Sequence, residues 1–242
     1  MNIWEKKFST FSVANKFKKG LGFRSNKWRD SQLNHFKLCN TNNKIPKELT
    51  YRYLEFVKII KKNSKKRHRF NILDVGGGFG LGFYLLKEKL KINNLNYTII
   101  ENYKIINEFK NKNLQVKYIN KINFNNKYDI VNCCSVIQYV NNWKKLVNDL
   151  AKTNTKLLYF SDMFLGKIST YATLQNYYDN KIPHWFINFD EFNNLLHDRG
   201  YRLIMKKKML TYRLGKKNLL SMNNFLKEDR IKNTLNLLYK KI

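Results

Sequence analysis

The feature that most constrains this chain is an apolar segment that ends in a carboxylate and runs directly into a glycine cluster. Residues 70–75 read Phe-Asn-Ile-Leu-Asp-Val, and four of the next five residues are glycine. The apolar run predicts a buried strand, the glycines a tight turn, and residues 81–87 a helix. Such a unit can hold a nucleotide-like ligand, because backbone N–H groups at the helix N-terminus are free to bind it.

The glycine spacing separates two kinds of nucleotide site. A dinucleotide-binding turn requires G-x-G-x-x-G or G-x-G-x-x-A, but counted from Gly76 or from Gly78 the third position is a large apolar residue. The chain instead reads D-x-G-x-G-x-G from Asp74 to Gly80, with a further glycine at Gly77. A glycine turn that binds nothing is the alternative interpretation, although a turn alone seldom needs spaced glycines and a strand-end acid.

This pattern resembles motif I of the class I S-adenosylmethionine-dependent methyltransferases. The resemblance implies S-adenosyl-L-methionine as cofactor, with Asp74 and the glycines Gly76, Gly77, Gly78 and Gly80 around its methionine part. Glycines suit this place because their backbone can approach a ligand with no side chain in the way. Glu101 closes the second predicted strand, and a carboxylate there can accept hydrogen bonds from both ribose hydroxyls.

From residue 70 the pattern alternates strand and helix, which predicts a parallel sheet. The expected strands are 71–75, 96–101, 114–119, 128–134 and 156–161, followed by an antiparallel edge pair at 201–205 and 208–212. The expected helices of this part are 81–90, 103–110, 142–152 and 189–198. The fold class is therefore α/β: the Rossmann-like class I methyltransferase fold, a mostly parallel seven-stranded sheet with an antiparallel C-terminal edge and helices on both faces.

We divide the chain into three parts. Residues 1–66 form an N-terminal helical cap, with helices expected at 10–17, 28–38 and 49–62. Residues 67–215 form the methyltransferase core. Residues 216–242 are expected to be a basic helical tail that packs through its leucines and Phe225.

Two later stretches, 128–140 and 173–192, look like segments of a group of methyltransferases often encoded among surface-polysaccharide genes. That resemblance implies Ser135 and Gln138 just beyond the fourth strand, where methyl donor and acceptor meet. It also implies Asn120 beside the adenine, although many relatives carry an Asp there. The placement is physically expected, because open α/β sheets bind ligands at the carboxyl ends of their strands.

A hydroxyl acceptor needs a base to remove its proton. His184 is the first candidate, because it lies between a proline and Trp185 in an expected loop over the strand ends; a histidine packed beside an aromatic run is the other interpretation. Asp162, directly after the fifth strand, is either a second base or a turn residue. Gln175 either orients a substrate hydroxyl or satisfies backbone groups, and Tyr139 is a candidate to stack on a sugar.

The formal charge of +30 suggests a nucleic-acid partner. Only nine of the 47 basic residues are Arg, however, and the Lys residues are spread over the whole chain. Arg is the residue preferred at bidentate phosphate sites, and no RNA-binding module is recognisable. We expect weak nonspecific affinity for nucleic acids or anionic membranes at low salt.

Other classes lack their signatures. The three cysteines, Cys39, Cys133 and Cys134, have neither disulfide nor metal-ligand spacing, and no Asp/Glu/His cluster indicates a metal. With only two prolines, the chain lacks the Asn/Asp-Pro-Pro-aromatic motif of enzymes that methylate amino nitrogens. No apolar run approaches about 18 residues and no signal-peptide pattern opens the chain, so we expect a cytoplasmic protein with no transmembrane segment.

The sequence thus predicts an S-adenosylmethionine-dependent methyltransferase of polysaccharide biosynthesis, which O-methylates a sugar or a surface-polysaccharide precursor. Two alternatives stay open. One is an RNA methyltransferase, and the other is a non-catalytic binding protein that keeps the methyltransferase fold.

Overall fold

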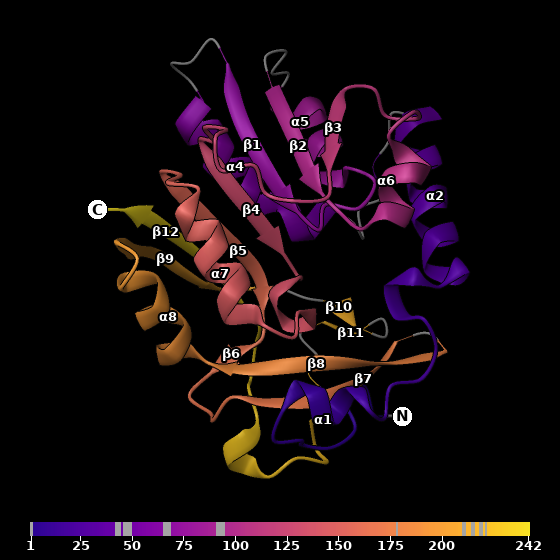
Figure 1. Ribbon diagram of the computed structural model, residues 1–242, viewed down its shortest axis with the longest axis vertical. Coiled ribbons are helices and arrows are strands. Elements are labelled where there is room, and N and C mark those ends of the chain that lie inside the picture. The colour runs from indigo at the N-terminus through magenta and orange to yellow at the C-terminus, as the bar shows by residue number, and fades with distance from the viewer. Residues whose placement is uncertain are drawn as a thin grey trace.

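The computed structural model describes residues 2–41, 45, 50–64, 69–90, 95–177, 179–209, 212–213, 216–217, 220 and 222–242. At its centre is a seven-stranded sheet of order β3-β2-β1-β4-β5-β12-β9 (Figure 1). The strands are β1 (Phe70–Val75), β2 (Leu95–Ile100), β3 (Val116–Ile119), β4 (Ile130–Cys134), β5 (Leu157–Met163), β9 (Tyr201–Lys208) and β12 (Leu235–Lys241). β1 to β5 are mutually parallel, and β12 is antiparallel to both of its neighbours. The expected fold class is confirmed.

Helices cover both faces of this sheet (Figure 1). The helices α4 (Leu54–Ser64), α5 (Leu81–Leu90) and α6 (Tyr103–Phe109) share one hydrophobic cluster with the sheet. The helices α7 (Trp143–Lys152) and α8 (Phe189–His197) share the cluster on the opposite face. Parallel strands buried on both faces explain why β1, β4 and β5 read as almost continuous apolar runs.

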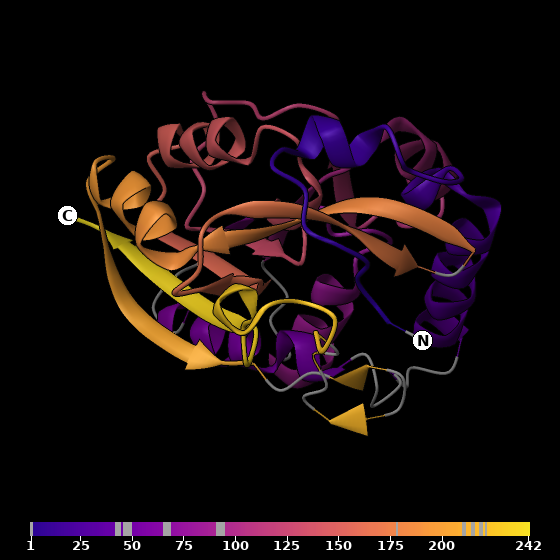
Figure 2. The ribbon, with the colours of Figure 1, turned by 90° about the horizontal axis from the view of Figure 1, so that it is seen from below.

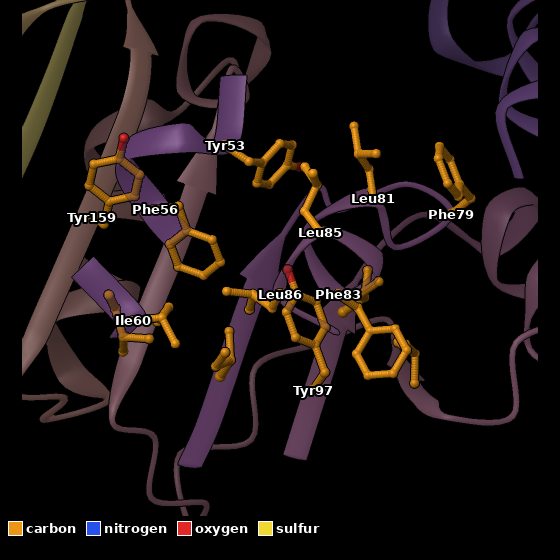
Figure 3. Packing of buried hydrophobic residues seen from close by; sticks show 14 of the residues in the cluster. Tyr53, Phe56, Ile60, Phe79, Leu81, Phe83, Leu85, Leu86, Tyr97 and Tyr159 are labelled. Carbon is orange, nitrogen blue, oxygen red and sulfur yellow. The ribbon is translucent and has the colours of Figure 1, made fainter. Parts of the chain in front are cut away.

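The first cluster contains many aromatic rings, several of which are shown in Figure 3. Phe56 of α4 stacks on Tyr159 of β5, with ring centroids 5.9 Å apart. Phe83 of α5 meets Tyr97 of β2 edge to face at 5.7 Å. The contact between Phe56 and Tyr159 attaches the N-terminal part of the chain to the sheet, because α4 precedes β1 in the sequence but packs against β5.

The C-terminal part differs from expectation. The described residues of the tail contain a single helical turn, η4 (Lys227–Asp229), and then the strand β12, so the prediction of a helical tail was wrong. The edge pair expected within residues 201–212 is instead β9 with β12. β10 (Tyr212–Arg213) and β11 (Lys216–Lys217) form a separate two-stranded sheet, and residues 210 and 211 lie outside the described part.

A second sheet lies across the carboxyl ends of the parallel strands, in the lower half of Figure 1 and toward the viewer in Figure 2. It consists of β6 (Leu165–Gly166), β7 (Tyr171–Tyr177) and β8 (Asn180–Asn188). The sequence predicted that His184 lies in a loop over the strand ends, and this was wrong, because His184 is part of β8. The N-terminal segment pairs with the outer strand, since Glu5 N–H donates to the Leu174 carbonyl at 3.0 Å.

The described part of the N-terminal region is only partly helical, because residues 2–10 contain no helix and run beside β7. Its helical elements are α1 (Phe11–Asn15), the short turns η1 (Gly22–Arg24) and η2 (Tyr51–Tyr53), the long helix α2 (Asn26–Thr41), and α4. The first residue of the helix expected at 49–62 lies outside the described residues. Within the described helices, none is long and apolar enough to cross a membrane.

Candidate cofactor and acceptor site

A cavity of about 400 Å³ opens at the carboxyl ends of β1, β2, β4 and β5. Its floor is the glycine turn after β1, and its walls come from residues at or just beyond the carboxyl ends of β2, β4 and β5. The N-terminal elements η1, α2 and η2 and the strand β7 complete it. Segments that are distant in the sequence therefore meet at the carboxyl ends of the parallel strands, which is where open α/β sheets bind their ligands.

The glycine turn is shaped by close approaches. Gly76 and Gly78 have φ values of 68° and 57°, the left-handed region that favours glycine. A Cβ on Gly77 would lie 2.5 Å from Asp74 Oδ2, and one on Gly78 would lie 2.7 Å from Gln32 Oε1 of α2. The turn is therefore a bare backbone surface under α2, which is what the methionine part of the expected cofactor requires.

Gly80 serves the turn from outside the cavity. Its N–H donates to the Gly77 carbonyl at 3.0 Å, and its φ is 98°. It does not line the cavity. Gly80 therefore contributes to the backbone conformation of the turn and has no position from which to contact a ligand in the cavity.

Asp74 lies beneath the turn and is fully buried. Its carboxylate accepts hydrogen bonds from Tyr97 Oη and Asn132 Nδ2, both at 2.6 Å. Burial raises the pKa of this carboxyl to about 7, although the two hydrogen bonds oppose the shift. Asp74 does not line the cavity, so its described contacts position the turn.

Glu101 lines the cavity immediately after β2. Its Oε1 accepts from Gly78 N–H at 3.3 Å and its Oε2 from Asn102 N–H at 2.8 Å. Burial raises the pKa of Glu101, and these N–H groups partly offset that effect. Oε2 also accepts from Asn102 Nδ2 at 2.9 Å. A carboxylate has about four acceptor positions. Three of them are occupied, so about one remains for a hydroxyl group on the cavity side.

Asn120 lies apart from the cavity. It is exposed after β3, and its Nδ2 donates to Tyr103 Oη. Among the residues that the structure describes, Asn102 is the amide side chain at the Glu101 end of the cavity.

A second polar group stands where β4 and β5 end. Ser135 and Asp162 both line the cavity, and both have left-handed backbones with φ of 58° and 52°. Ser135 Oγ donates to Asp162 Oδ2 at 2.9 Å, and Gln138 Nε2 donates to Ser135 Oγ at 3.0 Å. From β12, Asn236 Oδ1 accepts from Asp162 N–H at 3.3 Å. Left-handed non-glycine residues cost about 1–3 kcal/mol each and are concentrated at functional sites.

The remaining sequence candidates divide between the cavity and the core. Gln175 on β7 lines the cavity, and its Oε1 accepts from Tyr139 Oη at 2.8 Å. His184, expected in a loop, lies on β8 with 0% exposure and does not line the cavity. Its ring packs edge to face on Phe164 at 4.4 Å and on Tyr139 at 5.3 Å.

The sequence matches no protein-family model and no curated protein. Solved structures do resemble the fold. An S-adenosylmethionine-dependent methyltransferase from Clostridium acetobutylicum has a TM-score of 0.52 at 13% identity, covering 88% of this chain and 99% of that chain. The 1,6-didemethyltoxoflavin-N1-methyltransferase of Burkholderia thailandensis has a TM-score of 0.52 at 10% identity, covering 88% and 86%. A methyltransferase bound to the Haloferax volcanii Trm112 activator has a TM-score of 0.51 at 9% identity, covering 87% and 96%.

This chain has the class I methyltransferase fold. In that fold, the sequence analysis missed the residues that the N-terminal cap brings to the cavity. Phe23 of η1, Arg52 of η2 and the α2 residues Trp28, Gln32 and His35 all line it. No spacing rule connects them to the glycine turn, so only the tertiary structure reveals them.

Arg52 is the cation of the cavity. Its Nε donates to Tyr51 Oη at 3.3 Å. By its surface area Arg52 is exposed, so it lies at the edge of the cavity. Loss of hydration around the guanidinium would lower its pKa, but the Asp162 carboxylate raises it, and the net shift is upward. The pKa of His35 is lowered by burial and by Arg52. Within the described residues, no group of three His, Cys, Asp or Glu side chains is arranged to hold a metal ion.

Proposed function

We propose that this protein is an S-adenosylmethionine-dependent methyltransferase that transfers the methyl group to a hydroxyl of a small acceptor. The observation that carries the proposal is the convergence, in one cavity, of the bare glycine turn, the Glu101 carboxylate and the Ser135–Asp162 pair. A turn into which no Cβ fits, beside a carboxylate with a free acceptor position, suits a nucleoside attached to an amino acid.

The two ends of the cofactor would be held by different groups. Glu101 would accept a hydrogen bond from one ribose hydroxyl, with Asn102 beside it. The backbone of Gly76–Gly78 would lie along the methionine part, and Arg52 would pair with its carboxylate, because a guanidinium offers two parallel donors to a carboxylate.

When bound, the cofactor would supply a methyl group on a sulfonium. Transfer of that methyl group to an acceptor oxygen would break the carbon–sulfur bond and leave its electron pair on sulfur. The products would be S-adenosylhomocysteine, the methylated acceptor and the proton of the hydroxyl group. Alignment of the reacting atoms is worth about 7–11 kcal/mol in favourable cases. We assign the released proton to Asp162, because its carboxylate lines the cavity. His184 fits this role less well, because Tyr139 lies against its ring and the cavity does not reach it. Gln175 would orient the acceptor.

The identity of the acceptor divides the hypotheses. A sugar or polysaccharide-precursor hydroxyl remains the prediction of the sequence resemblance. The solved Burkholderia protein binds 1,6-didemethyltoxoflavin, which shows that this fold can serve a small molecule. The charge of +30 favours RNA as a second candidate, and a non-catalytic binding protein is the third.

Calorimetry with two ligands tests the cofactor site and its orientation. S-adenosylhomocysteine carries the amino-acid end, whereas 5′-methylthioadenosine lacks it. Wild-type protein should bind both, and Gly78→Arg and Glu101→Ala should lose both, with the fold intact by circular dichroism. Arg52→Gln should weaken S-adenosylhomocysteine about tenfold and leave 5′-methylthioadenosine unchanged.

Arg29→Gln is the matched control, because Arg29 is exposed and pairs with the neighbouring Asp30. It should bind both ligands as the wild type does. If wild-type protein binds neither ligand, the proposal of a methyltransferase is rejected. Equal losses of both ligands in Arg52→Gln would reject only the placement of the carboxylate.

A further inference from the structure

Four aromatic side chains form one wall of the cavity: Phe23 of η1, Trp28 of α2, Tyr139 of η3 (Ile137–Tyr139) and Tyr177 at the end of β7. We call them the aromatic wall. Each of the four is only half-buried, so part of each ring remains accessible from the cavity. Rings drawn from four separate elements toward one cavity indicate a surface for a ligand, because apolar area left accessible in a cavity favours an apolar occupant.

The rings of the wall stand at steep angles to one another. Phe23 lies at the centre, 4.8 Å from Tyr139 at 76°, 5.6 Å from Trp28 at 74°, and 5.3 Å from Tyr177 at 55°. Aromatic pairs favour offset stacking or edge-to-face contact. A planar ring in this corner can therefore stack on one member of the wall while it meets the edges of the others.

The polar side chains next to Tyr139 are hydrogen-bonded within the protein. Gln175 Oε1 accepts from Tyr139 Oη, and Ser135 Oγ donates to Asp162. A sugar carries a hydroxyl on almost every ring carbon, and a buried hydroxyl without a hydrogen-bond partner is destabilising. The wall thus suits a ring with one or two hydroxyl groups better than a saccharide.

We infer that the methyl acceptor is a small planar aromatic or heteroaromatic compound, bound against the aromatic wall with a hydroxyl directed toward Asp162. This inference rests on the proposed function and names its substrate class. A phenolic hydroxyl has a pKa of about 10 and gives its proton to a carboxylate more readily than an aliphatic alcohol does. The acceptor oxygen would take the methyl group and Asp162 the proton, so the step is balanced without a further reactant.

A matched pair of probes tests planarity directly. 2-Naphthol and decahydro-2-naphthol have the same carbon skeleton and one hydroxyl each, but only the first is planar and aromatic. Calorimetry on the full chain, with and without saturating S-adenosylhomocysteine, should show 2-naphthol binding about tenfold tighter than its saturated counterpart. Methyl glucoside should bind more weakly than either. Equal affinities, a preference for the glucoside, or no binding of 2-naphthol would overturn the inference.

Variants locate the binding at the wall. Phe23→Ala should weaken 2-naphthol about tenfold more than it weakens S-adenosylhomocysteine. Phe17→Ala is the matched control, because Phe17 is 54% exposed and packs on Phe8 outside the cavity. Should Phe23→Ala not fold, Tyr177→Ala provides the same comparison. Unchanged 2-naphthol affinity in the folded variant would reject the placement.

The two proposals fail separately in this design. If wild-type protein does not bind S-adenosylhomocysteine, the methyltransferase proposal is rejected. The titrations made without S-adenosylhomocysteine still decide whether the aromatic wall selects a planar ring.

Discussion

At the scale of single residues, Asp74, the strand-end acid of the glycine motif, makes its contacts within the protein. The Asp74 carboxylate is enclosed by Tyr97, Asn132 and the backbone of Gly77. It lies directly beneath Gly77 of the turn, whereas Glu101 lines the cavity. The two acids therefore differ in what they bind, although the sequence presents both as ends of neighbouring strands.

The pKa of Asp74 predicts a pH dependence of stability. Burial raises this pKa from 3.8 to about 7, so the folded protein keeps a proton that the unfolded chain has released between these values. The free energy of unfolding therefore decreases as the pH rises from about 4 to about 7. Asp74→Asn should remove this contribution, which is at most about 1.4 kcal/mol per pH unit.

Urea unfolding followed by circular dichroism at pH 4.5, 5.5, 6.5 and 7.5 measures it. Asp179→Asn is the control, because Asp179 is an exposed partner of Lys27 and should leave the slope unchanged. A slope in Asp74→Asn equal to that of the wild type would contradict the prediction.

At the scale of elements, β12 and the β7–β8 hairpin are the two features that the sequence analysis assigned wrongly. Leu235, Leu237 and Leu238 fit a helix face as well as a strand, and in a strand buried on both faces the alternation of apolar and polar residues disappears. β12 is such a strand, because Leu238 packs into the hydrophobic cluster on one face of the sheet and Leu237 into the cluster on the other. The β7–β8 hairpin was not predicted for a different reason, because its aromatic residues are equally compatible with a loop that leads into α8.

The position of β12 predicts a large effect at Leu237. This side chain is fully buried, and its residue pairs with Phe160 of β5 and Lys206 of β9. Leu237→Ala should lower the free energy of unfolding by about 2–5 kcal/mol, the usual cost of such a cavity. Lys240→Ala on the same strand is the control and should change it by less than about 0.5 kcal/mol. Urea unfolding measures both, and similar small effects would show that the tail does not belong to the sheet.

At the scale of the whole molecule, the net charge of +30 is not concentrated at the cavity. Arg52 brings a cation into the cavity, but Glu101 and Asp162 lie there with it. The many lysines instead lie along exposed parts of helices and strands, for example at Lys58 and Lys207 beside Glu55. We therefore expect polyanion binding and cofactor binding to be independent.

Salt concentration should separate the two. Binding of a 20-nucleotide oligothymidine, followed by fluorescence anisotropy, should weaken steeply between 50 and 200 mM salt, with a logarithmic slope of about 0.7 for each contacted phosphate. The affinity for S-adenosylhomocysteine should change less than about twofold over the same range. Tight oligonucleotide binding that persists at 200 mM, together with methyl incorporation into RNA, would favour the RNA methyltransferase instead.

The sequence by itself determined the fold class and the floor of the site. Strand, glycine turn and helix are local features, and the spacing from Asp74 to Gly80 and the strand-end Glu101 can be recognised without a partner segment. The strands β1 to β5 follow from local apolar runs in the same way.

The tertiary structure decided what covers that floor. Arg52, the aromatic wall and the Asn236 contact with Asp162 reach the cavity through contacts between segments far apart in the chain. Tertiary contacts also decided that His184 lies outside the cavity. Its burial depends on rings from distant parts of the chain, and no local sequence pattern contains that information.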